Sequence, residues 1–175
     1  MRFKKFSPMQ NKIILGIDPG YGRIGLAVIE KSKGNPVLVY SECLETDAKL
    51  PHSQRLLTIG EKIKEIIKKY KPEQVAVETL LWSKNKKTAL QVAEARGVIL
   101  LEVARQNVIL REFNPNQIKL AITGYGKSDK KQVISMVKKL VKLPQTVKEQ
   151  KRHDDEYDAI AIALTCSAIS LSTEV

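Results

Sequence analysis

A compact apolar run at residues 12–18 (KIILGID) restricts the possible folds more than any other part of the chain, because it ends in a carboxylate and a Pro-Gly pair. A short apolar run bounded by turn residues is typical of a buried strand. β-type patterning resumes at residues 23–30, so residues 19–22 are expected to form a hairpin turn. A third run, at residues 37–43, follows the turn signal Gly34-Asn35-Pro36. The chain is therefore predicted to open with three antiparallel strands.

Helices and strands alternate after this opening. Apolar residues at helical spacing between positions 56 and 67 predict a helix that ends before Pro72. Short strands are expected at residues 74–78 and 108–113, separated by a long helical pattern at residues 86–107. Further helices are predicted at residues 115–122, 128–143 and 155–169. This order indicates the α/β class, with a mixed five-stranded sheet and helices on both of its faces.

Length and composition are those of one globular domain. The chain has 175 residues, of which 43% are hydrophobic and 28% charged, so we expect one domain over residues 1–175, with a basic extension at 1–11 and a short tail at 171–175. No apolar stretch reaches the length of a membrane span, and the basic N-terminus lacks the apolar segment of a secretion signal. Two cysteines without CxxC spacing exclude a zinc ribbon or a disulfide framework. A reducing, cytoplasmic location is expected.

The net charge favours a polyanionic partner. Thirty Lys and Arg residues against nineteen Asp and Glu give a formal charge of +11. Such an excess suits nucleic acid first and a membrane surface second. A Lys-rich surface also serves solubility alone, so charge by itself does not decide between these interpretations.

Four acids stand where a functional site would need them. Asp18 and Glu78 each end a buried strand, where a carboxylate requires a partner. Asp155 and Asp158 lie three residues apart at the start of the last helix and so share one face. If the strands are neighbours and the helix begins over their ends, the four carboxylates converge. Two divalent cations roughly 4 Å apart would neutralise them and clamp the attacking and leaving oxygens of a phosphate displacement.

Structural explanations exist for each of these acids taken singly. Asp18 precedes a turn, and acids in a first helical turn complement the helix dipole. Asp154 could be the N-cap of the last helix, and His153 could be a metal ligand or a solvated loop histidine. The chain has neither a GxxxxGK[ST] phosphate loop nor a dinucleotide-binding fingerprint. The acids and the net charge together favour a metal-dependent nuclease.

Several motifs occur in a fixed order from about residue 13 to residue 168: Gly16-Ile17-Asp18-Pro19-Gly20 with Gly25, Val77-Glu78, Asn85, Ala95-Arg96-Gly97, and Asp155 with Asp158-Ala159-Ile160-Ala161. Together they resemble the RuvC family of Holliday-junction resolvases, the crossover junction endodeoxyribonucleases. Actin-like ATPases and sugar kinases share the first motif but need roughly twice this length in two lobes. The resemblance implies a ribonuclease H-like fold, a homodimer, and resolution of four-way DNA junctions by paired symmetric nicks in recombination and repair.

The resemblance also implies the site residues. The family's four acidic, metal-binding positions fall on Asp18, Glu78, Asp155 and Asp158. The spacing before Ala-Ile-Ala favours Asp155 over Asp154, and some relatives carry histidine at that third position. Two Mg²⁺ ions per site are implied, with Mn²⁺ as a substitute.

Basic side chains are implied as DNA contacts. Two family lysines that contact phosphates near the active site resemble Lys119 and Lys130, with matching spacing through Gly124 and Gly126. Lys84 in a Lys-rich loop and Arg96 complete the basic contacts that we expect. The family works beside the RuvA-RuvB branch-migration complex, and this partnership is implied by the resemblance alone.

One aromatic position departs from the family pattern. The family often places an aromatic residue three positions after the catalytic glutamate, to stack on an unpaired base. Here that position is Leu81, and Trp82 follows it. Either side chain is a candidate for this wedge, and Trp82 could instead pack in the core, as a lone tryptophan usually does.

The helix predicted at residues 86–107 is unusually apolar. Between Ala89 and Ala104, twelve of sixteen residues are apolar or glycine. A helix that is apolar on most sides must be buried on more than one side. We expect a second copy of the chain to supply the additional cover, with Ala93 and Gly97 allowing close approach. The alternative is a helix covered wholly by its own chain.

Two other functions stay open. The chain could be another ribonuclease H-like nuclease that acts on RNA-DNA hybrids or RNA. It could also be a non-catalytic junction-binding protein whose acids only cap helices. Hybrid cleavage would indicate the first, and binding without metal-dependent cutting the second.

Overall fold

The structure is a computed structural model that describes residues 12–31, 34–79, 86–142 and 152–169. Its strands are β1 (Lys12–Asp18), β2 (Arg23–Lys31), β3 (Val37–Glu45), β4 (Gln74–Glu78) and β5 (Ile109–Phe113). Its helices are α1 (His52–Tyr70), α2 (Lys86–Arg105), α3 (Pro115–Thr123), α4 (Lys130–Leu140) and α5 (Asp154–Ile169). Every predicted element is present, and their bounds differ from the predicted ones by a few residues. The predicted extension at 1–11 and tail at 171–175 lie outside the described residues.

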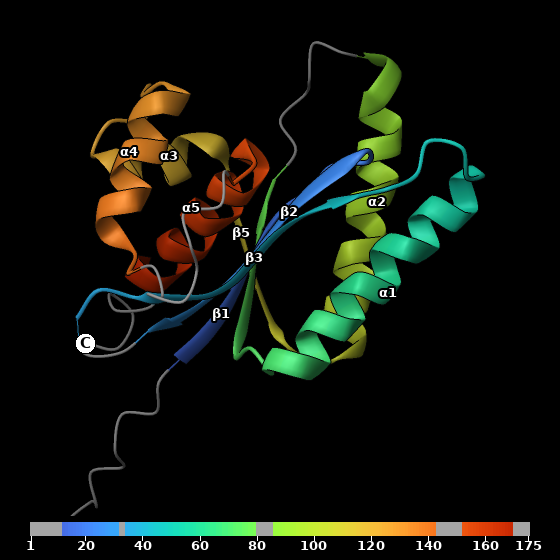
Figure 1. Ribbon diagram of the computed structural model, residues 1–175, viewed down its shortest axis with the longest axis horizontal. Helices are drawn as coiled ribbons and strands as arrows, with labels where there is room; N and C mark the ends of the chain where they lie inside the picture. Colours follow the sequence, from blue (N-terminus) through green and yellow to red (C-terminus); the bar gives the residue numbers. More distant parts are fainter. Residues whose placement is uncertain (1–11, 32–33, 80–85, 143–151, 170–175) are drawn as a thin grey trace, which may run out of the picture.

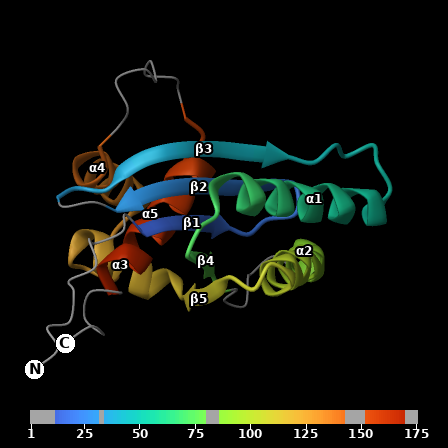
Figure 2. The same ribbon diagram turned by 90° about the horizontal axis from the view of Figure 1, so that it is seen from below.

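The five strands form one mixed sheet in the order β3-β2-β1-β4-β5 (Figure 2). The first three strands pair antiparallel, as predicted, and β4 pairs parallel with both β1 and β5. In the parallel register Ile17 lies opposite Val77. The next residues along these two strands, Asp18 and Glu78, therefore lie side by side at the same edge of the sheet.

Helices cover both faces of the sheet, as predicted. Helices α1 and α2 lie on one side, and α3, α4 and α5 lie on the other (Figure 1). Side chains alternate between these two cores along β1: Leu15 and Ile17 pack with α1 and α2, whereas Ile14 packs with α5. This alternation directs Asp18 toward the α5 side of the sheet.

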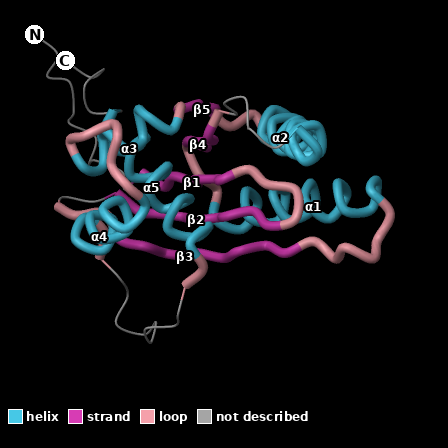
Figure 3. The backbone as a smooth tube through the Cα atoms, turned by 90° about the horizontal axis from the view of Figure 1, so that it is seen from above, coloured by secondary structure: helices cyan, strands magenta, loops and turns pink. Residues whose placement is uncertain are grey.

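Helix α5 lies directly on β1 and β2 (Figure 3). It is buried from Ala159 to Ser167, and its alanines have short side chains that let the helix backbone approach the sheet. Glycines in the sheet allow the close approach. A Cβ atom at Gly16 would lie 2.2 Å from the carbonyl oxygen of Ala159, and one at Gly25 would lie 1.9 Å from that of Asp155. Small residues on both surfaces therefore hold the first turn of α5 against the strand ends.

Among the described residues, helix α2 is covered along one stripe. Ala95, Ile99 and Val103 are buried against the core that α1 shares. On the opposite side Leu90 is 70% exposed and Leu101 is 50% exposed, and no atom among the described residues lies within 4 Å of a Cβ built at Gly97. Within the described part of the chain, an apolar stripe of α2 thus faces outward.

Two further features concern the described part of the chain. None of the helices in this part of the chain combines the length and the apolar character of a membrane span. Cys43 and Cys166 are both free thiols, the first half-buried and the second buried.

Candidate active site

The carboxylates that end β1 and β4 share a hydrogen bond. Burial raises the pKa of Asp18 well above its usual value, and the negative charges of Glu78, Asp158 and Asp155 raise it further. Burial and the Asp158 carboxylate likewise raise the pKa of Glu78, against the opposing effects of the Asp18 hydrogen bond and the Lys119 charge. These raised pKa values indicate that the four predicted acids form one electrostatic cluster whose negative charge is only partly compensated.

The first two turns of α5 bring the other two acids to this cluster. Asp158 lies 3.1 Å from the ammonium group of Lys130. Burial raises the pKa of Asp158, and the Lys130 interaction only partly offsets that effect. Asp155 has a side chain that is 23% exposed, and its carboxylate lies 3.6 Å from Arg23 Nε and 3.7 Å from Cys43 Sγ. Both side chains therefore lie near the ends of the central strands.

Asp154 is placed differently from Asp155. Its side chain is 64% exposed and lies 3.4 Å from Lys130. The groups that raise the pKa of Asp18 include Asp155 but not Asp154. Asp155 therefore interacts with Asp18 and Asp154 does not, and the role of Asp155 as a ligand stays a prediction.

The interpretation of Asp154 as the N-cap of this helix is wrong. Helix α5 already begins at Asp154, and the preceding residue is His153. The His153 N–H donates to Glu156 Oε1 over 3.0 Å, and the Glu156 N–H donates to the His153 carbonyl over 3.1 Å. Glu156 thus accepts a hydrogen bond from the residue that precedes the helix, the role expected of a capping side chain. Asp154 lies in the first turn of the helix and faces Lys130.

Both predicted lysines line a pocket of about 250 Å³ beside the acids. Glu78 and Asp158 form its acidic wall, Lys119 and Lys130 its basic one, and apolar side chains such as Ile118 and Val133 complete it. Capping boxes fix the helices that carry the lysines: Asn114 with Gln117 at the start of α3, and Asp129 with Gln132 at the start of α4. The pocket therefore combines two carboxylates and two ammonium groups on rigid elements.

Lys130 is held by the acids themselves. Its bonds to Asp158 and Asp154 raise its pKa, although its partial burial acts in the opposite direction. A cation bound at Asp158 would compete directly with this ammonium group.

The Arg96 side chain of α2 packs beside the ends of β4 and β5. Its side chain is half-buried, donates to the carbonyl oxygen of Glu78 over 3.4 Å, and forms an ion pair with Glu112 of β5. These contacts tie α2 to β4 next to a predicted ligand. Contact between Arg96 and DNA stays a prediction.

Sequence reasoning missed two neighbours of Asp155, namely Arg23 and Cys43. Both come from the opening meander, since β2 pairs with β1 on one side and with β3 on the other. The hairpin pattern was a usable signal, because the first residue after the turn must lie near the end of β1. The remaining predicted contacts, Leu81, Trp82 and Lys84, lie outside the described residues, as does Asn85 of the motifs.

The donor set of the acid cluster fits hard divalent cations, which prefer carboxylate oxygens. Among the residues that the structure describes, only Cys43, Glu45 and His153 bring three candidate ligand atoms within 4.8 Å of one another. The carboxylate oxygens of the four acids are spaced more widely than this. His153 belongs to the group with Cys43 and Glu45.

This sheet order, with carboxylates on adjacent strand ends and on a helix packed across them, defines an α/β nuclease of the ribonuclease H-like class. A sequence model of the family described as crossover junction endodeoxyribonuclease RuvC matches residues 14–166. The chain belongs to the RuvC family.

Relatives and solved structures agree with this assignment. The RuvC of Thermosipho melanesiensis is 46% identical over 150 residues, which cover 86% of this chain and 93% of that protein. The RuvC of Petrotoga mobilis is 47% identical over 152 residues, which cover 86% and 90%. The structure of Thermus thermophilus RuvC in complex with Holliday junction substrate superposes with a TM-score of 0.83 at 30% identity, over 93% of this chain and 96% of that one.

A more distant structure shows the fold alone. The yeast mitochondrial Holliday junction resolvase superposes with a TM-score of 0.66 at 13% identity, over 91% of this chain and 79% of that one. The mixed sheet with helices on both faces is therefore shared well beyond the range of sequence similarity.

Proposed function

We propose that this protein resolves four-way DNA junctions by paired symmetric nicks, as a metal-dependent endonuclease of recombination and repair. Family membership supports the reaction class, and the likeness to a RuvC solved with its junction supports the substrate. The observation that carries the proposal is the acid cluster around Asp18, which lies beside a lysine-lined pocket.

The four acids are the proposed ligands of two Mg²⁺ ions, for which Mn²⁺ would substitute. When bound, such ions activate the attacking water and stabilise the departing 3′ oxygen of the phosphodiester. Asp18 holds the central position, since it interacts with Glu78, Asp158 and Asp155 alike. Glu78 and Asp158 extend the ligand set toward the pocket, and Asp155 extends it toward β2.

Lys119 and Lys130 are the proposed phosphate contacts. Both line the pocket that contains Glu78 and Asp158, so a phosphate held there would contact ligands and lysines together. Their positive charges would offset the charge that develops on the phosphate in the transition state. Lys130 would first have to leave Asp158, which lies 3.1 Å away.

Other predicted contacts take supporting roles in this proposal. Arg96 positions Glu78 through its carbonyl and also remains a candidate DNA contact. Leu81 or Trp82 would stack on an unpaired base, and Lys84 would contact a phosphate.

Two nicks at symmetric positions require two active sites related by a twofold axis. We propose that the exposed stripe of α2, defined by Leu90, Ala93, Gly97 and Leu101, forms the homodimer interface. Small residues in its centre allow two helices to approach closely. Cooperation with the RuvA-RuvB complex in the cytoplasm is part of this proposal and is supported by the family resemblance alone.

Cleavage of defined substrates tests this function. Labelled four-way junction, linear duplex and RNA-DNA hybrid would each be incubated with Mg²⁺, with Mn²⁺ and with a chelator. We expect metal-dependent paired nicks on the junction alone, with 5′ phosphate and 3′ hydroxyl ends that a ligase seals. Cleavage of the hybrid would indicate a different ribonuclease H-like nuclease, and binding without cleavage would indicate a junction-binding protein.

A further inference from the structure

The face of β3 that is turned toward α5 carries a row of polar side chains. Ser41, Cys43 and Glu45 alternate along the strand and so share one face. The Ser41 hydroxyl donates to Glu156 of α5 over 2.6 Å, and Cys43 Sγ lies 3.7 Å from Asp155. This row therefore lies along the first turn of α5, beside the acid cluster but apart from it.

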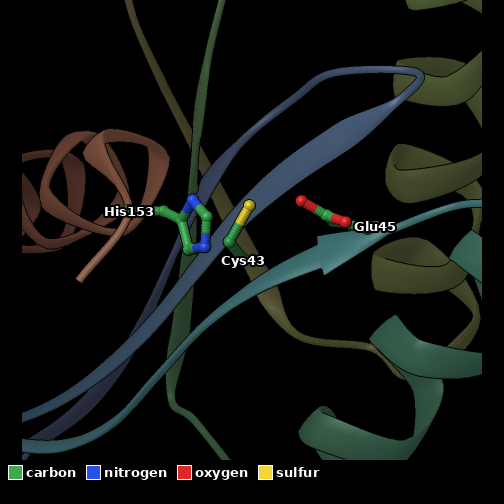
Figure 4. Close-up of side chains that lie close together, drawn as sticks. All are labelled: Cys43, Glu45 and His153. Atoms are coloured by element: carbon green, nitrogen blue, oxygen red, sulfur yellow. The ribbon is translucent and has the colours of Figure 1, made fainter. Parts of the chain in front are cut away.

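Three chemically different donors meet at the end of this row. Figure 4 shows the His153 ring at the start of α5 beside Cys43 on β3, with Glu45 further along the strand. A ring nitrogen, the thiol sulfur and a carboxylate oxygen all lie within 4.8 Å of one another. Among the described residues, neither the His153 ring nor the Glu45 carboxylate has another hydrogen bond or ion pair, and the proposed function uses none of the three.

We propose that Cys43, Glu45 and His153 form a second metal site, which binds a thiophilic divalent cation of the Zn²⁺ class. Thiolate, imidazole and carboxylate are the ligands that zinc takes in proteins, whereas Mg²⁺ and Ca²⁺ prefer oxygen alone. Neighbouring ligands of a tetrahedral zinc lie about 3.5 Å apart, for bonds of roughly 2.0–2.3 Å. Glu45 and His153 are exposed, so their side chains have room to rotate toward Cys43.

The charge balance gives this site a consequence for cleavage, which rests on the proposed function. The cation displaces the thiol proton of Cys43 to solvent, so the site gains one net positive charge. That charge lies next to Asp155 and competes for its carboxylate with the ions of the catalytic site. Occupation of the second site is therefore expected to lower junction cleavage.

Cobalt spectroscopy tests the site without reference to activity. Co²⁺ would be titrated into the full-length protein in excess Mg²⁺, which occupies the catalytic acids. We expect a thiolate-to-cobalt charge-transfer band that saturates at one equivalent, in the wild type and in the control Cys166→Ser. The band should vanish in Cys43→Ser, and the Co²⁺ affinity should fall about tenfold or more in His153→Ala. No band in the wild type, or an unchanged band in Cys43→Ser, would overturn the site.

A second arm tests the effect on cleavage. Micromolar Zn²⁺ against millimolar Mg²⁺ should slow junction cleavage in the wild type and in Cys166→Ser, and leave Cys43→Ser unaffected. Equal inhibition of Cys43→Ser would place the inhibitory zinc at the catalytic acids and overturn the regulatory role. If the protein cut no junction at all, the proposed function would fail, whereas the cobalt band would still decide whether the second site exists.

Discussion

Asp18 is the residue at which the fold and the chemistry oppose each other most strongly. Folding buries its carboxylate at a strand end and surrounds it with three further acids, so its pKa and those of Glu78 and Asp158 rise. Such a cluster lowers the stability of the folded domain. Bound cations would offset this loss, because they neutralise the carboxylates. The acids that serve the proposed function should therefore destabilise the metal-free protein.

The pH dependence of stability follows from these shifts. Because the three carboxyl groups have higher pKa values in the folded state, the folded protein binds more protons than the unfolded chain. In chelator, stability should therefore be fully present below the unfolded pKa values near 4 and should fall as the pH rises through the raised ones. Asp18→Asn should flatten this slope and raise the melting temperature at pH 8 by about 2–4 °C. Thermal unfolding at pH 5 and pH 8 measures both effects, and a variant less stable than the wild type at pH 8 would contradict them.

Lys130 links the cluster to the phosphate pocket. Lys130→Gln should lower the rate of junction cleavage about a hundredfold, because a group that stabilises developing charge is removed. The same change should lower the Mg²⁺ concentration for half-maximal rate, since the ammonium group no longer competes for Asp158. Rates measured over a Mg²⁺ series give both values. The adjacent, exposed Lys131 provides the control Lys131→Gln, and an increased Mg²⁺ requirement in Lys130→Gln would contradict the competition.

At the scale of elements, the site depends on how closely α5 approaches the sheet. The helix carries Asp155 in its first turn and Asp158 just after it, and Gly25 of β2 lies directly beneath the first turn. Close backbone contact with the sheet therefore helps to set the position of Asp155 and Asp158.

Gly25→Ala tests this dependence. The new methyl group would meet the Asp155 carbonyl oxygen at 1.9 Å, so the first turn of α5 must move. We expect a loss of about 1–3 kcal/mol in stability and a larger loss in cleavage, with junction affinity retained. Gly22→Ala is the matched control, because its methyl group meets only a flexible arginine end at 3.9 Å. A Gly25→Ala variant that cuts like the wild type would show that the contact does not position the acids.

At the scale of the whole molecule, the two faces of the sheet carry different functional surfaces. The side of α3, α4 and α5 carries the acid cluster and the lysines, whereas the side of α1 and α2 carries the outward apolar stripe. A dimer formed through α2 would leave both active sites uncovered. The net charge of +11 would then attract DNA to a particle with two sites.

Gly97→Asp tests the dimer. A charge at the centre of the α2 stripe would be buried without a partner, so the variant should sediment at 19.7 kDa, where the wild type should show twice that mass. Its cleavage should be limited to single, uncoordinated nicks. Leu57→Asp is the control, since Leu57 of α1 is 59% exposed but has polar neighbours along its face. A wild type that sediments as a monomer with and without junction DNA would contradict the interface.

The sequence alone determined the order of the elements and the opening meander, and it predicted the four acids as candidates. Hydrophobic periodicity and turn residues are local, so strand ends such as Asp18 and Glu78 can be located without knowledge of the fold. The family motifs supplied the choice of Asp155 and the lysines. The loop that carries Leu81 and Trp82 stays a sequence-based prediction.

Only the tertiary structure decided which side chains meet across distant segments. It showed that Arg23 and Cys43 adjoin Asp155, that Arg96 pairs with Glu112, and that His153 lies with Cys43 and Glu45. Such contacts depend on sheet register and on the rotation of each helix about its axis. Both are set by the packing of the whole core, in which glycines and alanines let α5 touch the sheet, and no local pattern encodes them.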